Sequence, residues 1–360
     1  MKRIICLVLA LVMMGTLLTA CGGSAAETTT AAGGDTTQAG SGETTTGAQV
    51  SADAVEIKIA TVGNEKHQST LAANFFKEKL EEVSGGSMTA TIYPNASLGG
   101  EREEAEGVKL GTIEMTIVTT DSTLPSWVPE VQVLSIPYLF ANKEEAYYIL
   151  DEVLQDEFAP LFEAQGFKHL GFVELGFRHF TNNVREVVKA EDMNGLSIRV
   201  QEAPIWFALM DALGATATPV SFNELYTALQ QKMVDGQENP ITSIAASGFD
   251  EVQKYMVLDG HTYAAESIII NLSFYNNLTD EQKVWVEEAV AYAIPAQRAA
   301  VDSMEEGYLE QIRGNGVTVS EPDLDSFKAA TADLYKRPEV TALVSPELVE
   351  MIMTKLAERR

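Results

Sequence analysis

The amino-acid sequence predicts a two-lobed α/β protein in which one long helix spans both lobes. Strand-like and helix-like segments alternate along the chain, an order typical of helices packed on a mostly parallel sheet. About 310 residues follow a leader and a polar segment, which suits two lobes of about 150 residues better than one small domain. The longest helical segment, from residue 278 to about 313, would extend roughly 50 Å, which exceeds the width of one small lobe.

The N-terminus has the pattern of a secretory signal peptide over residues 1–20, MKRIICLVLALVMMGTLLTA. Lys2 and Arg3 precede an apolar run that is too short and too close to the N-terminus for an ordinary membrane span. The residues LTAC (18–21) resemble a bacterial lipobox, which predicts cleavage before Cys21 and attachment of a lipid to its thiol. The alternative is a plain signal peptide followed by an accidental cysteine.

Residues 21–52 are predicted to form a lipid-anchored flexible linker, because Gly, Ser, Thr and Ala dominate and Lys, Arg and aromatic residues are absent. We therefore expect the protein at the outer face of the cytoplasmic membrane. Cys6 would leave with the signal and Cys21 would carry the lipid, so the folded part contains no cysteine. This excludes disulfides, thiolate nucleophiles and cysteine metal sites there.

The chain is strongly acidic, with 52 Asp and Glu against 25 Lys and Arg and a formal net charge of −27. This balance argues against nucleic-acid binding and against docking to anionic lipid. It does not exclude an anionic ligand, because cations in a dry cleft act over a few ångströms while surface acids are screened. The four histidines lack metal-site spacing, and no nucleophile elbow, Walker loop or dinucleotide motif appears. We predict no metal and no cofactor, and we treat an enzyme as the competing class.

The first part of the folded region is predicted to alternate strand, helix, strand, helix, strand. The segment 55–62, VEIKIATV, alternates apolar and polar residues, and 68–84 has the spacing of an amphipathic helix. A strand at 87–94, a helix at 100–111 and a strand at 113–120 follow. This order favours parallel pairing of the three strands.

A second set of elements follows, without a visible internal repeat. Helices are expected at 144–165, 204–215 and 221–236, and strands at 167–175, 196–200 and 265–274. Ser221 and Glu224 have the spacing of a capping box at the start of the third of these helices.

The long helix begins at a Thr279–Gln282 capping box and ends at Gly314 and Gly316, with Pro295 placed to kink it. Two lobes on a common backing helix enclose a cleft, and a cleft at a domain interface is the default ligand site. This is the shape of a venus flytrap. We place lobe I at 53–175 and 265–304, and lobe II at 176–264 and 305–360.

Six stretches of the chain resemble segments of TRAP-transporter solute-binding proteins, the DctP-like family. They are IYPNASLGGERE (92–103), LSIPYLF (134–140), LGFRHFTNN (175–183), NGLSIRVQ (194–201), LGATATPVSFNELYTALQQKMVDGQENP (213–240) and FYNNLTDEQK (274–283). The similarity covers nearly all of residues 54–335, and the run ALQQKMVDGQENP is its most specific part. The resemblance implies a type II, periplasmic-binding-protein-like receptor that closes over an organic acid. It also implies delivery of that acid to small and large membrane subunits driven by a sodium gradient. We expect the receptor to be a monomer.

The resemblance also implies roles for three residues. Arg199 would form a two-pronged salt bridge with the ligand carboxylate, Asn239 would fix that arginine and the carboxylate, and Arg178 would supply a second cation. A planar guanidinium suits a carboxylate because two parallel N–H bonds match its geometry. The alternatives are a buried pair of Arg199 with an internal acid such as Glu238, and a surface position for Arg178 at a strand end. Gln201 departs from the family, in which many members have proline or methionine there, and we expect it to affect substrate identity.

Further residues are candidates to line the pocket, either as aromatic walls or as partners of ligand hydroxyls: Glu101, His67, Thr119, Thr120, Phe222 and Trp206. Each has a simpler alternative. The aromatic side chains are often core residues, Glu101 could be a solvated carboxylate at a helix N-terminus, and His67 could be an ordinary loop histidine.

The favoured function is therefore a TRAP receptor for a carboxylate-bearing solute, with a sugar acid such as a uronate preferred. A dicarboxylate would need a second cation opposite Arg199, whereas a sugar acid would need several hydroxyl partners, and the sequence offers more of the latter. The alternatives are a C4-dicarboxylate receptor of the same family and a sensory solute-binding lipoprotein that works with a signalling protein.

Overall fold

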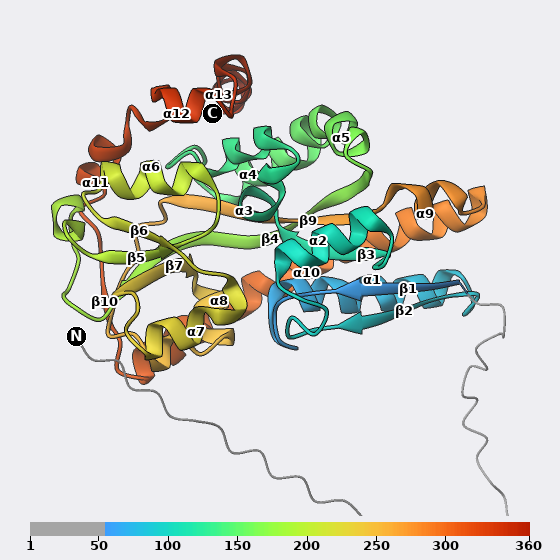
Figure 1. Cartoon of the computed structure of the whole chain (residues 1–360), viewed down its shortest axis with the longest axis horizontal. Helices are drawn as coiled ribbons and strands as arrows, with labels where there is room; N and C mark the ends of the chain where they lie inside the picture. Colours follow the sequence, from blue (N-terminus) through green and yellow to red (C-terminus); the bar gives the residue numbers. More distant parts are fainter. Residues whose placement is uncertain (1–54) are drawn as a thin grey trace, which may run out of the picture. The chain divides into compact units, whose positions relative to one another are not determined.

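The computed structural model describes residues 55–360, which belong to one compact unit (Figure 1). The predicted signal peptide (1–20), the lipidation site Cys21 and the linker (21–52) lie outside the described residues. Within residues 55–360, no helix combines the length and the apolar character needed to cross a bilayer.

One ten-stranded mixed sheet forms the centre of the described part of the chain. Its main path has the order β2-β1-β3-β9-β4-β7-β5-β6, and β8 joins β4 and carries β10. The strands are β1 (Val55–Ala60), β2 (Met88–Tyr93), β3 (Met115–Thr119), β4 (Phe167–Asn182), β5 (Ser197–Val200), β6 (Thr216–Pro219), β7 (Gly236–Pro240), β8 (Tyr255–Val257), β9 (Thr262–Asn271) and β10 (Thr318–Ser320).

The predicted parallel pairing of the first three strands is confirmed, since β1 pairs in parallel with both β2 and β3. The two long strands β4 and β9 run antiparallel to each other at the middle of the sheet. In Figure 1 they lie between the blue β1 and β2 on one side and the yellow-green β5 and β6 on the other. These two strands therefore connect the halves that the sequence predicts as separate lobes.

Strand β4 is longer than the predicted 167–175. Its register against β9 shifts between His169 and Gly171 and again between Glu174 and Gly176. Both glycines have positive φ, 155° and 120°, as residues at β-bulges often do. Each shift breaks the two-residue alternation, so the strand pattern becomes hard to recognise before it ends at Asn182.

The helices cover both faces of this sheet. They are α1 (Gln68–Val83), α2 (Glu101–Leu110), α3 (Thr120–Thr123), α4 (Lys143–Ile149), α5 (Gln155–Ala164), α6 (Pro204–Ala212), α7 (Phe222–Gln230), α8 (Ile241–Ala246), α9 (Leu272–Asn277), α10 (Asp280–Gly314), α11 (Leu324–Thr331), α12 (Pro338–Thr341) and α13 (Pro346–Arg359). The predicted helix 144–165 is α4 and α5 joined by a π-helical turn at Leu150–Leu154.

Two further predictions at element ends were wrong. The expected capping box of α7 does not form, because the side chain of its N-cap residue, Ser221, makes no capping hydrogen bond. The predicted strand 265–274 ends earlier, at Asn271, because the Asn271 side chain accepts a hydrogen bond from the Phe274 N–H (2.7 Å) and starts α9.

The long helix α10 spans both halves, as predicted. Thr279 and Gln282 form the reciprocal capping box, with hydrogen bonds of 3.2 and 2.9 Å. Near its start, Val286 packs into the apolar core beneath α1. Near its end, Ile312 belongs to a separate core beneath α7 and α8. One continuous helix, which contains Pro295, is thus shared by two apolar cores.

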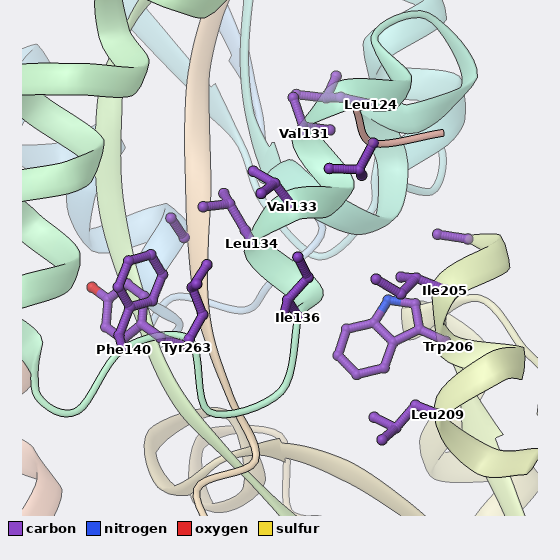
Figure 2. Close-up of a cluster of buried hydrophobic side chains, with 14 of the residues drawn as sticks. Leu124, Val131, Val133, Leu134, Ile136, Phe140, Ile205, Trp206, Leu209 and Tyr263 are labelled. Atoms are coloured by element: carbon purple, nitrogen blue, oxygen red, sulfur yellow. The ribbon is translucent and has the colours of Figure 1, made fainter. Parts of the chain in front are cut away.

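The largest apolar core lies around β4, α4, α5 and α6. Figure 2 shows part of it, where Trp206 points from α6 toward the segment that carries Leu134 and Ile136. Trp206 has no exposed surface. Its indole therefore stabilises the core on one side of the sheet.

Candidate ligand-binding site

A cavity of about 120 Å³ lies where several strands end at their carboxyl edge, after β1, β3, β5, β6 and at β7. Open α/β sheets bind ligands at this edge. The lining residues are Val62, His67, Gly100, Glu101, Arg102, Glu103, Thr119, Ser122, Thr123, Ser126, Leu175, Arg178, Arg199, Gln201, Glu202, Val220, Ser221, Phe222 and Asn239. Elements from both halves of the sheet contribute to the wall.

The structure brings seven of the nine predicted site residues to this cavity: Arg199, Asn239, Arg178, Glu101, His67, Thr119 and Phe222. Thr120 and Trp206 do not line it. Thr120 starts α3 and turns inward, where its Oγ1 lies 2.8 Å from Ser267 Oγ. Trp206 is the core residue described above, which corrects its assignment as an aromatic pocket wall.

The sequence interpretation missed several hydroxyl groups at the same edge. Ser122, Thr123 and Ser126 line the cavity just after β3. The run TTDST (119–123), directly after an apolar strand, was the available signal. Polar side chains at the carboxyl end of a parallel strand are well placed to meet a ligand.

Arg199 lies on β5 and is 3% exposed. Its Nε donates a 2.7 Å hydrogen bond to the Val220 carbonyl oxygen. Within residues 55–360, no carboxylate lies within ion-pair distance of Arg199, and its two terminal nitrogens make no hydrogen bond. Burial lowers the pKa of Arg199 to about 10, so the guanidinium is still a cation at neutral pH. The alternative pairing of Arg199 with Glu238 does not form.

Arg178 is instead the arginine that pairs with Glu238. Its Nε and Nη2 both contact the Glu238 carboxylate, with Nη2 at 3.0 Å from Oε1, and Nη2 also donates to the Glu238 carbonyl oxygen at 2.8 Å. Arg178 is 1% exposed and lies within β4. Arg178 therefore does not lie at a surface strand end, and it is not free to act as a second cation for the ligand. Both expectations for Arg178 are corrected.

Asn239 fixes Arg178 and not Arg199. Its Oδ1 accepts from Arg178 Nη2 at 2.9 Å, and its Nδ2 donates to Gln237 Oε1 at 2.6 Å. The antiparallel register of β4 and β7 explains why Arg178 meets Glu238 and Asn239. Arg178 lies opposite Pro240, and Phe180, two residues further along β4, lies opposite Glu238.

A buried histidine completes the charge balance around Arg178. His261 contacts Asp259 Oδ2 at 2.8 Å and Glu238 Oε2 at 3.3 Å. Burial alone would lower the pKa of His261, but Asp259 and Glu238 raise it to about 9. Burial alone would raise the pKa of Glu238, but Arg178 and His261 lower it to about 2. Two cations and two anions thus neutralise one another behind the cavity wall.

On the other side of the cavity, Glu101 begins α2. It accepts hydrogen bonds from the Thr119 N–H (3.0 Å), Thr119 Oγ1 (2.8 Å) and Thr123 Oγ1 (2.8 Å). Glu101 is therefore held in a fixed position by the loop after β3. A ligand hydroxyl could reach its remaining acceptor capacity.

His67 is the N-cap residue of α1, and its side chain is buried against the cavity. Its Nδ1 accepts from the Ser69 N–H (3.3 Å) and lies 2.8 Å from Ser69 Oγ. Burial lowers the pKa of His67 to about 4, so the ring is neutral at pH 7. With Nδ1 acting as an acceptor, the proton resides on Nε2. The ring packs edge-on against Phe222, with centroids 5.4 Å apart.

A family model described as bacterial extracellular solute-binding protein, family 7 (DctP), matches residues 59–340. The chain belongs to this family. The family prediction made from the sequence is therefore confirmed.

Individual relatives agree with this assignment. A solute-binding protein of Verminephrobacter eiseniae is 37% identical over 279 residues, which are 77% of this chain and 82% of that protein. A TRAP periplasmic solute-binding protein from Polaromonas sp. JS666, bound to D-erythronate, is 32% identical with a TM-score of 0.80. Another from Sulfurospirillum deleyianum, with bound succinate, is 26% identical with a TM-score of 0.78. Each of these two structures aligns with 83% of this chain and 98% of its own. The predicted two-lobed α/β fold is thereby confirmed.

Proposed function

We propose that this member of the DctP family is the receptor of a TRAP-type transporter, and that it captures a carboxylate-bearing solute, preferably a sugar acid. The observation that carries the proposal is Arg199, a buried guanidinium that faces the cavity without a carboxylate partner among the described residues. Burying a charge is costly unless it is paired. A ligand carboxylate would supply the missing partner through two parallel hydrogen bonds.

Arg199 cannot supply the whole affinity. A charge-assisted hydrogen bond contributes about 1.5–3 kcal/mol, whereas a micromolar complex needs about 8 kcal/mol. Glu101, Thr119, Asn239 and the Nε2–H of His67 offer acceptors and donors for hydroxyl groups in the same cavity. This supply of hydroxyl partners favours a sugar acid, and the D-erythronate found in the Polaromonas relative supports the choice.

Capture would occur by closure of two lobes, which we place at 53–175 with 265–304 and at 176–264 with 305–360. The boundaries fall within β4 and β9, the strands shared by both halves of the sheet, and within the long helix α10. Loops from the two sides touch beside the cavity, where Asn64 Nδ2 donates to the Ala246 carbonyl oxygen at 2.7 Å and Gln68 Nε2 contacts Ser243 Oγ at 3.1 Å. Such contacts would stabilise the closed form.

The receptor would be a monomer that binds without catalysis and hands its ligand to small and large membrane subunits. We further propose that a lipid on Cys21 holds it at the outer face of the cytoplasmic membrane. Metabolic labelling with a radioactive fatty acid tests the anchor, because Cys21→Ser should abolish the label. Recovery of the bound acid unchanged after release would support binding without turnover.

A thermal-shift screen of sugar acids and dicarboxylates on the purified protein tests the central assignment. A true ligand at 100 times its Kd should add about 2.7 kcal/mol of stability. Arg199→Met should lose that stabilisation, and Arg199→Lys should retain little of it because lysine offers a point charge. Arg313→Met, at an exposed arginine near the end of α10, is the matched control. Wild-type affinity in Arg199→Met would refute the role of Arg199.

A further inference from the structure

We propose that the cavity selects acids with one carboxylate and rejects acids that carry a second carboxylate at the opposite end. The inference rests on the proposed function and specifies the charge of the ligand. It follows from which charged side chains of the cavity wall have partners and which do not.

Three cations line the cavity, but two of them are already neutralised. Arg178 is paired with Glu238 behind the wall. Arg102, at the exposed rim, has its Nε 3.2 Å from Glu106 Oε1 and its Nη1 3.1 Å from Ser126 Oγ. Arg199 is the lining cation of the described chain that lacks an acidic partner, so the site offers one position for a ligand carboxylate.

Three carboxylates face the same cavity: Glu101, Glu103 and Glu202. Among residues 55–360, none of them has a Lys, Arg or His within ion-pair distance. Burial lowers the pKa of Arg199, whereas the charge of Glu238 and, to a smaller extent, the charges of Glu101 and Glu202 act to raise it. The carboxylates of Glu101 and Glu202 therefore lie within electrostatic range of the position where the ligand would be bound.

His67 does not compensate for these acids. It is a polar group of the wall on the lobe opposite Arg199, and burial lowers its pKa to about 4. A neutral imidazole can donate an Nε2–H bond to a hydroxyl but brings no charge to balance a second carboxylate. The far end of the cavity is thus suited to a hydroxyl group, which can donate to Glu101 and accept from His67.

A ligand with a second carboxylate would place that charge near Glu101 and Glu202. Like charges a few ångströms apart in a partly desolvated site repel strongly enough to weaken binding tens of times. The first carboxylate also experiences these acids, but Arg199 offsets the repulsion there, whereas the second carboxylate would meet no unpaired cation among the described lining residues. A relative with bound succinate shows that some members of the family bind dicarboxylates. The rejection of a second carboxylate proposed here is therefore a property of the side chains in this cavity and not of the whole family.

Matched pairs of acids test the inference, because an aldonate and its aldarate share a carbon chain and differ only at the terminal group. The pairs are D-erythronate with meso-tartrate and D-galactonate with galactarate. Their Kd values would be measured by isothermal titration calorimetry on the full-length protein at pH 7.5. We expect the aldarate of any pair that binds to be at least 30-fold weaker than the aldonate.

Two variants locate the cause of the difference. Glu101→Gln keeps one oxygen that can accept from Thr119, while its amide NH2 can donate to the Thr123 hydroxyl. Glu202→Gln changes an exposed side chain that folding should tolerate. Each should narrow the ratio of the two Kd values several-fold, and the double variant should bring it below about fivefold. Glu144→Gln, at an exposed site on α4 outside the cavity, should leave the ratio unchanged.

The outcomes separate this inference from the proposed function. Equal affinities within a pair would overturn charge selection and leave the receptor function standing. An unchanged ratio in Glu202→Gln and in the double variant would show that these carboxylates are not its cause, which also overturns the inference. Absence of binding by every acid, mono- or dianionic, would overturn both.

Discussion

The buried carboxyl group of Glu104 makes the stability of this protein sensitive to pH. Glu104 lies on α2, one turn after Glu101, and has no exposed surface. Its Oε2 accepts a 3.2 Å hydrogen bond from Thr116 Oγ1, and its Oε1 has no partner. Burial, followed by the charge of Glu101, raises the pKa of Glu104 to about 9, and the bond from Thr116 only partly opposes this. The folded protein therefore keeps this side chain protonated at pH 7.

The sign of the effect on stability follows from the two pKa values. The folded pKa lies above the ordinary value of 4.5, so the contribution of Glu104 is fully present below about pH 4.5 and is lost as the pH rises toward the folded value. Each pH unit between them costs about 1.4 kcal/mol, so roughly 3 kcal/mol is lost by pH 7. Glu104→Gln keeps the shape and the acceptor for Thr116 but cannot ionise in the unfolded chain. We expect the variant to be about 3 kcal/mol more stable than wild type at pH 7 and nearly equal to it at pH 4.

Urea unfolding at pH 4, 5.5 and 7 would measure this difference. Glu103→Gln is the matched control, because it makes the same change on the exposed side of the same helix and should shift the free energy of unfolding by less than about 0.5 kcal/mol. A difference between Glu104→Gln and wild type that stays constant from pH 4 to pH 7 would refute the assignment of a protonated Glu104.

Three other substitutions have defined expected results, each measured by urea unfolding. Glu238→Gln should lower the free energy of unfolding by about 3–5 kcal/mol, because it leaves the buried Arg178 without its carboxylate; a loss below about 1 kcal/mol would contradict this. Trp206→Ala should lower the free energy of unfolding by about 3–5 kcal/mol and change the ligand Kd less than threefold, since the indole lies in the core. A large loss of affinity with unchanged stability would show that Trp206 contacts the ligand. Gly236→Ala would place a Cβ 2.0 Å from the Thr181 carbonyl oxygen, so β4 and β7 must separate, and the free energy of unfolding should fall by about 3 kcal/mol or more. An unchanged stability would show that the two strands are not so closely paired.

Much of the fold could be predicted because local patterns and tertiary structure agree. In β1, α1 and β2 the apolar spacing has the period of the element that forms, and the turns between them contain glycine or proline. The start of α10 was also predictable, since the Thr279–Gln282 capping box is a purely local interaction. Elements with such local determinants matched their predicted bounds within a few residues.

The remaining differences arise where tertiary contacts override the local pattern. The bulges of β4 are stabilised by its pairing with the neighbouring strand β9, and the sequence of β4 alone does not reveal that pairing. Ser221 lines the cavity, and its side chain makes no capping hydrogen bond to the first turn of α7. Trp206 and Phe207 are adjacent on α6, yet the first is fully buried and the second is 44% exposed. Which of two neighbouring aromatic residues faces inward depends on how the helix is rotated against the core.

The charge of the ligand site depends on strand register more than on the number of arginines. Arg178 and Glu238 are 60 residues apart in the sequence. They meet because Phe180, two residues after Arg178 on β4, lies opposite Glu238 on β7. A slip of one residue in that pairing would move the Glu238 side chain to the other face of the sheet. Arg178 would then be free, the cavity would hold two unpaired cations, and a dicarboxylate would fit it better than a sugar acid. Because the same two arginines are compatible with either ligand class, the register of β4 against β7 is what leaves Arg199 as the cation that a ligand must neutralise.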